Sequence, residues 1–193
     1  MCNFGPMSKI ILITGGQRSG KSSYAEEVAL RMSDTPVYIA TAQVLDAEFA
    51  ERVARHQARR GPQWTNIEEE RFLSRHDLTG RVVLIDCVTL WCTNFMLGMD
   101  SPSAASGHDS QAEPLPDIGQ VLDAVKAEFD KLTSQDATFI FVTNEIGSGG
   151  VSANALQRRF TDLQGWANQY IASRADTVVL MVSGIPVTIK GNL

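Results

Sequence analysis

The feature that most constrains this chain is a glycine-rich segment at 15–22, which reads GGQRSGKS and matches the pattern G-x-x-x-x-G-K-[ST]. In loops of this pattern the backbone N–H groups hold phosphate oxygens, the lysine reaches the outer phosphates, and the hydroxyl that follows binds Mg²⁺. The pattern requires a strand before it and a helix after it. The apolar run at 9–14 and the amphipathic segment at 21–32 supply both, so a nucleoside triphosphate is the expected ligand.

Short apolar runs alternate with amphipathic segments along the rest of the chain. We expect further strands over 37–40, 81–86, 138–143 and 177–182, with a short last one over 186–190, and further helices over 46–60, 89–97, 117–132 and 154–173. This alternation is typical of a parallel sheet that is covered on both faces. It predicts an α/β fold of the P-loop NTPase type, with a mostly parallel central sheet flanked by helices on both faces. Ligands of such sheets bind at the carboxyl ends of the strands, so the loops after Thr14, Ala40, Asp86 and Thr143 should share one edge.

Composition narrows the class of protein. The 193 residues fit one domain over 9–193, with a loose tail at 1–8 and an exposed, polar loop at 98–116. Seventeen Lys and Arg against 22 Asp and Glu give a net charge of −5, which argues against a general nucleic-acid binder. No apolar run reaches the length of about 18 residues that a membrane span needs. Three cysteines are an odd number that argues against a disulfide framework and fits a reducing, cytoplasmic compartment.

The Mg²⁺ of such a site needs an acidic partner at the end of a neighbouring strand. Asp86 follows the apolar run 82–85 and is the candidate, together with Ser22; a capping role for Asp86 is the structural alternative. The phosphate loop alone does not separate a kinase from an ATPase or a nucleotidyltransferase. The N-K-x-D pattern that reads guanine in signalling GTPases does not occur in the sequence.

His56 stands out among the three histidines because of its neighbours. It shares a helix face with Phe49 and Val53, and Arg59 and Arg60 follow at the spacing at which side chains meet on a helix. Guanidinium groups hold phosphate oxygens and keep an imidazole unprotonated, which suits attack on phosphorus. The alternative is a histidine that lines a helix beside a solvated basic face.

Six segments then follow one another in a characteristic order. They are TGGQRSGKS at 14–22, YIATAQ at 38–43, the spaced Arg52, His56 and Arg60 with Trp64 and Glu68 after them, the strand end at Asp86 with Cys87 and Thr89, TNEIG at 143–147, and VSGIPVTIK at 182–190. Together they resemble the bifunctional adenosylcobinamide kinase/adenosylcobinamide-phosphate guanylyltransferase family of cobalamin biosynthesis. The segments cover nearly the whole chain, so the resemblance is more specific than the phosphate loop alone.

The resemblance implies two reactions. The first phosphorylates the aminopropanol hydroxyl of adenosylcobinamide; the second transfers GMP from GTP to that phosphate through a covalent guanylyl-histidine, giving adenosylcobinamide-GDP and pyrophosphate. His56 matches the position of the nucleophile, and Lys21 is the second catalytic candidate. GTP, Mg²⁺, a corrinoid substrate and a homotrimer are also implied, with ATP an alternative donor for the kinase step. The nucleotide contacts would be Gly15, Gly16, Gln17, Arg18, Ser19, Gly20, Lys21, Ser22, Thr41, Ala42, Gln43, Gln57, Ala58, Arg59, Arg60, Glu68 and Asp86.

Three questions stay open at the level of sequence. The general base of the kinase step has only weak candidates in Asp46, Glu48 and Glu68, and the sequence favours a surface charge over a catalytic role for each of them. Trp64 and Trp91 suit either a flat corrinoid surface or a packed core. A plain P-loop small-molecule kinase and a P-loop regulatory ATPase also fit the loop, and neither needs His56.

Overall fold

The computed structural model describes residues 8–42, 60–98 and 117–193. The expected helix at 46–60, apart from a bend at Arg60, lies outside them, as do nearly all of the expected tail and of the expected loop at 98–116. The strands are β1 (Lys9–Gly15), β2 (Val37–Ala40), β3 (Thr65–Glu68), β4 (Val82–Asp86), β5 (Thr138–Val142), β6 (Thr177–Val182) and β7 (Ile185–Lys190). The helices are α1 (Lys21–Met32), α3 (Val88–Gly98), α4 (Ile118–Thr133) and α5 (Ala155–Arg174), with short 3₁₀ turns η1 (Leu73–Arg75) and η2 (Gly147–Gly149).

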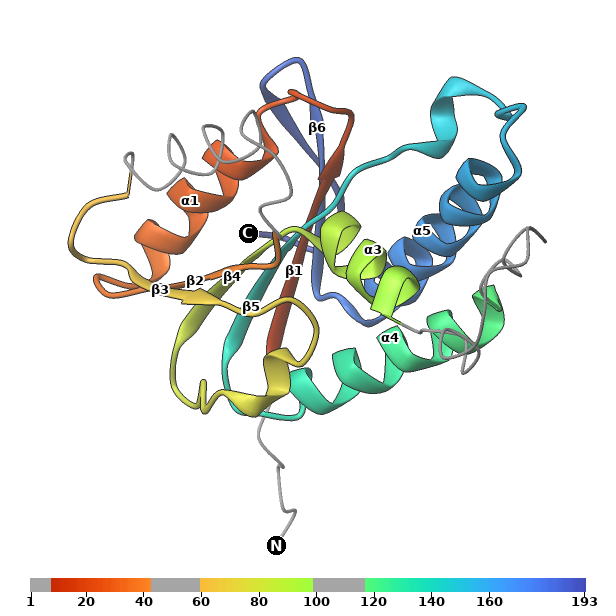
Figure 1. Cartoon of the computed structure of the whole chain (residues 1–193). Helices are drawn as coiled ribbons and strands as arrows, with labels where there is room; N and C mark the ends of the chain where they lie inside the picture. Colours follow the sequence, from red (N-terminus) through yellow and green to blue (C-terminus); the bar gives the residue numbers. More distant parts are fainter. Residues whose placement is uncertain (1–7, 43–59, 99–116) are drawn as a thin grey trace, which may run out of the picture.

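The strands form one sheet in the order β3-β2-β4-β5-β1-β6-β7. Every neighbouring pair is parallel except β6 and β7, which form an antiparallel hairpin. The mostly parallel sheet predicted from the apolar runs is therefore confirmed. The carboxyl ends of β1, β2, β4 and β5 lie at one edge, at the top of Figure 1, where the loop from β1 to α1 also lies.

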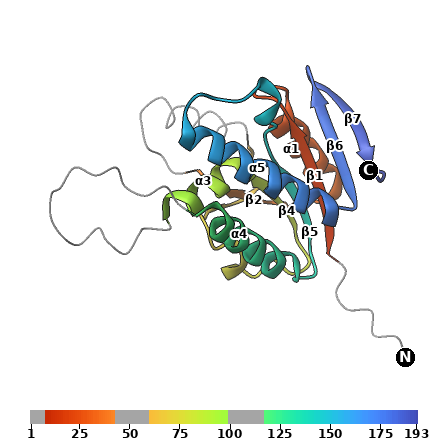
Figure 2. The same ribbon diagram turned by 90° about the vertical axis from the view of Figure 1, so that its right-hand side faces the viewer.

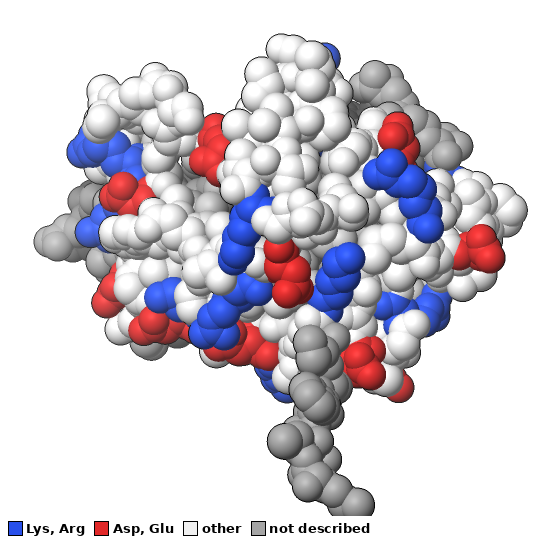
Figure 3. All heavy atoms as spheres, turned by 180° about the vertical axis from the view of Figure 1, so that it is seen from behind, with Lys and Arg blue, Asp and Glu red and all other residues white. Residues whose placement is uncertain are grey.

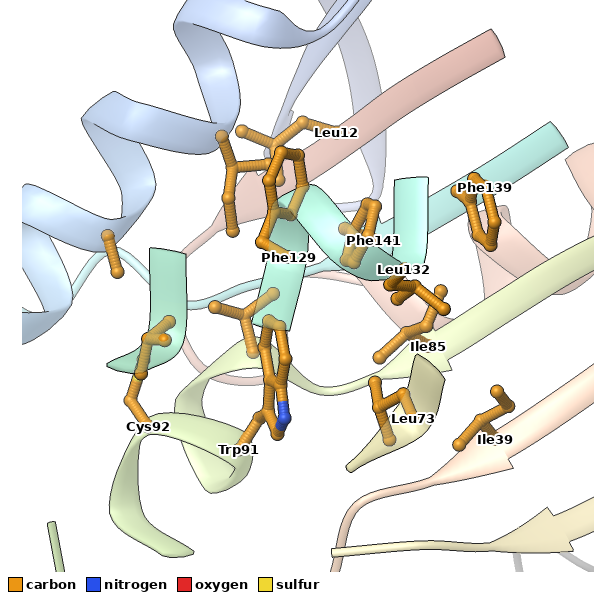
Figure 4. Packing of buried hydrophobic residues seen from close by; sticks show 14 of the residues in the cluster. Leu12, Ile39, Leu73, Ile85, Trp91, Cys92, Phe129, Leu132, Phe139 and Phe141 are labelled. Atoms are coloured by element: carbon orange, nitrogen blue, oxygen red, sulfur yellow. The ribbon is translucent and has the colours of Figure 1, made fainter. Parts of the chain in front are cut away.

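Helices cover both faces of the sheet, as Figure 2 shows. On one face, Ile11 and Ile13 of β1 pack with Ala25 and Val28 of α1. On the other face, Leu12 packs with side chains of α3, α4 and α5. Figure 4 shows Trp91, Phe129 and Phe141 within this second, larger core. Each fully buried side chain of this size contributes about 1.5–3 kcal/mol, so the two cores fix the sheet edge at which the loops gather.

Two helix starts are set by capping side chains. Asp117 accepts a hydrogen bond from the backbone N–H of Gly119, and Asn154 accepts one from that of Gln157. These side chains satisfy N–H groups that have no partner within the helix, which is why α4 and α5 each begin one residue later than expected.

The structure differs from the sequence-based expectation in two places. β3 was not expected, because its sequence TNIE is polar and largely exposed and has no apolar period to reveal it. The apolar spacing within 154–173 predicts an inner face that includes Leu156, but Leu156 is exposed, since the buried positions of α5 begin only at Leu163. The first turns of α5 therefore extend past the core.

The β6–β7 hairpin forms the outer edge of the sheet. Its two turn residues, Ser183 and Gly184, have φ angles of 52° and 85°, which is the left-handed geometry that tight hairpin turns need. All of β7 is exposed, and Ile185 and Ile189 leave 65% and 60% of their surfaces uncovered. In Figure 3, basic and acidic side chains are interspersed over the face opposite to that of Figure 1. Among the described helices, none has both the length and the apolar character of a membrane span.

Candidate functional site

The glycine-rich loop joins β1 to α1 at the carboxyl edge of the sheet. Gly20 has a φ of 95° and forms the N-terminal boundary of α1, where no described side chain caps the helix. A side chain at Gly15 would place its Cβ 2.5 Å from the carbonyl oxygen of Met181, so only glycine fits there. The open N-terminus of α1 and the closely packed loop form the anion-binding arrangement that the sequence pattern predicts.

Lys21 is the basic group of this loop. Its side chain is only 7% exposed, and Nζ donates a hydrogen bond of 2.5 Å to the carbonyl oxygen of Gly16. The ammonium group is thus folded back over the loop that would hold the phosphates. A cation in this position stabilises negative charge on the outer phosphates of a bound nucleotide.

The turn between β6 and β7 contacts the phosphate loop and stabilises its conformation. The backbone N–H of Gly184 donates to the carbonyl oxygen of Ser19 over 3.0 Å. A Cβ on Gly20 would approach Gly184 Cα to 3.3 Å, so the two backbones are in close contact. The last hairpin of the chain therefore helps to fix the conformation of the loop near its beginning.

Asp86 ends β4 at the same edge, two strands away from β1. The hydroxyl of Tyr38 donates to Asp86 Oδ2 over 3.0 Å. Burial, and then the charge of the Asp86 carboxylate, raise the pKa of Tyr38 far above its usual range, so the phenol stays a donor at physiological pH. Within the described part of the chain, Asp86 caps neither a helix nor a turn; its side chain is oriented by Tyr38 of β2 and remains partly exposed.

Arg60 lies over the other side of the same tyrosine. Its guanidinium carbon is 3.5 Å from the centre of the Tyr38 ring, and its Nε donates to Asn66 Oδ1 over 2.9 Å. Its buried Nη1 has no hydrogen-bond partner within the described ranges. Arg60 is the one member of the Gln57–Arg60 run that the structure describes, and it is attached to β2 and β3.

Thr41 connects the carboxyl ends of β2 and β4 through hydrogen bonds. Its hydroxyl donates to the carbonyl oxygen of Cys87 over 2.9 Å and accepts from the Cys87 N–H over 2.8 Å. Its own carbonyl accepts from Asn94 Nδ2 over 2.7 Å. The side chain is fully buried, so its geometry favours a role in fixing the loop after β2, while nucleotide contact by Thr41 and the adjacent Ala42 stays a prediction.

The other predicted residues fall into two groups. Glu68 is exposed at the end of β3, where it and Asp86 flank Ala40 in register on either side. Gln43, His56, Gln57, Ala58 and Arg59 lie outside the described residues, as do Asp46 and Glu48. The structure therefore brings together the phosphate loop, Lys21, Ser22 and Asp86 at one edge, with Arg60 and Glu68 farther along it.

Sequence reasoning assigned no role to Glu145, which the structure places beside the phosphate loop. Its backbone N–H donates to the carbonyl oxygen of Gly15 over 3.1 Å, and its Oε1 accepts the hydroxyl of Thr14 over 2.7 Å. The sequence feature that could have identified Glu145 is its position just after an apolar strand, at the carboxyl edge of the sheet.

Trp64 and Trp91 belong to the core. Trp91 is fully buried, with its indole N–H donating to the carbonyl oxygen of Arg71 over 2.8 Å. Trp64 packs edge-to-face on Tyr38 with ring centres 6.0 Å apart. Of the two alternatives, core packing accounts for both side chains, and neither offers a flat exposed surface to a corrinoid.

The phosphate loop, the strand-end acid and the sheet order define this chain as a P-loop nucleotide-binding protein. An ATPase from the type III secretion system of pathogenic bacteria has a similar fold, with a TM-score of 0.55 over 93% of this chain and 56% of that chain. Their sequences are 11% identical, so the likeness concerns the fold alone.

The particular family follows from the sequence comparisons. The family model for cobinamide kinase / cobinamide phosphate guanyltransferase (CobU) matches residues 11–189, and this chain belongs to that family. The bifunctional adenosylcobalamin biosynthesis protein CobP of Pseudomonas aeruginosa is 38% identical over 184 residues, covering 93% of this chain and 96% of the relative. The corresponding CobU proteins of Escherichia coli and Salmonella typhimurium are 37% and 38% identical over 189 residues, covering 94% of this chain and 99% of each relative.

Proposed function

We propose that this chain carries both activities for which its family is named. It phosphorylates the aminopropanol hydroxyl of adenosylcobinamide and then transfers GMP from GTP to the new phosphate, releasing pyrophosphate. The observation that carries this proposal is the match of the family model over residues 11–189, which includes the complete phosphate loop.

The triphosphate binds on the loop at 15–22. Backbone N–H groups of the loop and the N-terminus of α1 hold the phosphate oxygens, and Lys21 moves from the Gly16 carbonyl to the outer phosphates. Both reactions use this one site, because the described residues form one such loop beside one strand-end acid. Contacts from Gln17, Arg18, Thr41, Ala42, Gln43 and Glu68 complete the binding site in this proposal.

The donor atoms fit Mg²⁺. Ser22 at the start of α1 and Asp86 at the end of β4 would hold the ion, since hydroxyl and carboxylate oxygens together with phosphates and waters are the ligands Mg²⁺ prefers. Among the described residues no cluster of three or more His, Cys, Asp or Glu forms a metal site. When bound, the ion neutralises charge on the phosphates.

GMP transfer proceeds through His56. The imidazole nitrogen attacks the α-phosphorus of GTP, the bond to the bridging oxygen breaks, and pyrophosphate leaves. A phosphate oxygen of the corrinoid then attacks the same phosphorus and releases His56. Arg60, four residues farther along the chain and held against Tyr38, supports this assignment, because it places a guanidinium at the edge where the nucleotide binds.

Assembly and location are further parts of the proposal. We assign a homotrimer, as the resemblance implies, and the exposed apolar side chains of β7 offer a surface for subunit contact. Light scattering on the purified chain tests this directly. We place the protein in the cytoplasm, where the buried free thiols of Cys87 and Cys92 and the nucleotide substrates are maintained.

The test follows label from GTP into the protein. With α-labelled GTP we expect acid-labile, base-stable protein label, and with γ-labelled GTP none. The label should be absent in His56→Asn, which should keep the kinase activity. Lys21→Met should lower both activities on the order of 10²–10³-fold, because it removes charge stabilisation common to both. Absence of α-label in the wild-type protein, with nucleotide still bound, would leave a plain kinase as the function.

A further inference from the structure

The end of β5 lies between the two groups that handle the nucleotide. In the sheet, β5 separates β1, which carries the phosphate loop, from β4, which ends in Asp86. Neighbouring strands are about 4.8 Å apart, so a residue just after β5 is one strand spacing from each. Three polar residues, Thr143, Asn144 and Glu145, occupy this place.

Two of these three residues are turned into the fold. Thr143 is fully buried, and its hydroxyl donates to Asn168 Oδ1 over 2.6 Å. Asn144 uses both its backbone N–H and its side-chain amide on the hydroxyl of Thr89, at 3.1 and 3.0 Å. Glu145 is the exposed member, and it lies beside the phosphate loop.

The carboxylate of Glu145 is held by one oxygen. Oε1 accepts the hydroxyl of Thr14 over 2.7 Å and the amide of Asn168 over 3.3 Å. Asn168 is itself fixed in a buried network, where its Oδ1 also accepts from Gln164 over 2.8 Å. Such networks restrict the side chains that they contain, so the carboxylate is positioned rather than free to turn. Within the described ranges, Oε2, the second oxygen of this exposed side chain, makes no hydrogen bond or ion pair.

A carboxylate held in place beside the proposed triphosphate site, as in Glu145, is unfavourable for nucleotide binding unless it has a function. Like charges at this range repel, and the cost falls on nucleotide binding. A carboxylate that accepts a proton from an attacking hydroxyl offsets that cost during the reaction, because general base catalysis contributes about 10²–10⁴-fold in rate.

The other described candidates lie farther away. Glu68 ends β3, which is four strands from β1, or about 19 Å along the sheet. That exceeds the hydrogen-bonding reach that a general base needs toward a hydroxyl at the outer phosphate. Asp86 is two strands from β1, and the hydrogen bond from Tyr38 orients its carboxylate for its proposed role as a Mg²⁺ ligand.

We propose that Glu145 is the general base of the kinase step, an inference that rests on the proposed function. The hydroxyl oxygen of the corrinoid attacks the γ-phosphorus while its O–H bond breaks and the proton passes to Glu145 Oε2. The bond from the γ-phosphorus to the bridging oxygen breaks, and the nucleoside diphosphate leaves with that electron pair. Thr14 and Asn168 are positioning residues that hold Oε1.

The decisive variant is Glu145→Gln, which keeps the size of the side chain and an oxygen that accepts from Thr14. We expect the kcat of the kinase step to fall about 10²–10³-fold, with the KM for nucleotide within about threefold of wild type. GMP transfer to presynthesised cobinamide phosphate should stay within about threefold, because that step abstracts no proton from a hydroxyl. Glu145→Asp, which keeps the charge, should recover part of the kinase rate. Asp123→Asn, on the exposed side of α4, is the matched control and should change neither activity.

The outcomes separate this inference from the proposed function. A wild-type protein without kinase activity contradicts the proposed function itself. An active wild type with a Glu145→Gln variant of near-normal kcat overturns the inference and leaves the function standing. A parallel fall of both activities, or a large rise in the KM for nucleotide, also overturns it, since either result assigns Glu145 a structural role in the phosphate loop.

Discussion

The guanidinium of Arg60 stacks on the ring of Tyr38, with 3.5 Å between its central carbon and the ring centre. Tyr38 at the same time donates its hydroxyl to Asp86. One side chain of β2 thus contacts both the arginine that follows the His56 segment and the acid proposed to hold Mg²⁺. Tyr38 therefore connects Arg60 with Asp86, and this connection can be tested from either end.

Arg60→Lys should weaken GMP transfer. Lysine keeps the charge but loses the planar group that stacks on Tyr38 and bonds Asn66, a contact of the kind that contributes about 0.5–2 kcal/mol. We expect about a tenfold lower rate of enzyme-bound GMP formation from α-labelled GTP, with the kinase rate within about threefold. Arg31→Lys is the control, because Arg31 stands 5.9 Å from the Tyr24 ring on the surface of α1. Equal effects of the two substitutions would contradict the prediction.

Tyr38→Phe should change the dependence on Mg²⁺. The phenylalanine ring keeps the packing against Trp64 and Arg60 but no longer donates to Asp86. Loss of a hydrogen bond that orients a metal ligand costs about 10–100-fold in metal affinity. The Mg²⁺ concentration for half-maximal activity should therefore rise by at least about tenfold in both reactions. An unchanged Mg²⁺ titration would show that Asp86 is not a ligand or does not need Tyr38.

Asn94→Leu should destabilise the fold. The buried amide of Asn94 donates to the carbonyls of Thr41 and Glu70, at 2.7 and 2.9 Å. Leucine has a similar volume but leaves both carbonyls without this donor, at about 1–3 kcal/mol each. A loss of about 3 kcal/mol lowers the Tm of a domain of this size by about 6–12 °C. Thr93→Ala, which removes only a bond within α3, should shift the Tm by much less in the same calorimetric scan.

The thiols of Cys87 and Cys92 should be unreactive at neutral pH. Burial, and then the charge of Asp86, raise the pKa of Cys87 to about 11, and burial raises the pKa of Cys92 to about 12. A raised pKa keeps a thiol protonated until the pH approaches that value, so at pH 8 on the order of one Cys87 in a thousand is a thiolate. Iodoacetamide at pH 8 should leave both peptides unmodified in the native protein and alkylate both after denaturation. Mass spectrometry of the two peptides decides this, and rapid native alkylation of either would count against the burial described.

Much of the fold could be predicted from the sequence because its elements carry strong periodic signals. The observed bounds of α1, β2 and β6 coincide with the predicted ranges 21–32, 37–40 and 177–182. Buried parallel strands are continuous apolar runs bounded by turns, and few other structures produce that pattern. β3 escaped prediction because a short polar edge strand owes its existence to pairing with β2.

The candidate site was predictable only where local sequence defines it. The phosphate loop and the strand-end Asp86 are local features, and their meeting at one edge follows from the parallel sheet. The contacts that orient them are not local. Tyr38 and Asp86 are 48 residues apart, and Thr14 and Glu145 are 131 apart. Similarly, the sequence around His76 indicates no partner for its imidazole, whereas in the structure its Nε2 lies 3.7 Å from Glu69 Oε2.

The bond between Gly184 and Ser19 has a mechanical consequence. It links the hairpin at the edge of the sheet directly to the phosphate loop, because the two-residue turn between β6 and β7 contacts that loop. A displacement of this turn would therefore move the backbone of the phosphate loop directly, whereas the far end of β7 is tied to α5 through the hydrogen bonds of Lys190 to the carbonyls of Ala172 and Ser173. We therefore expect the position of the last hairpin to influence how tightly the loop binds a nucleotide.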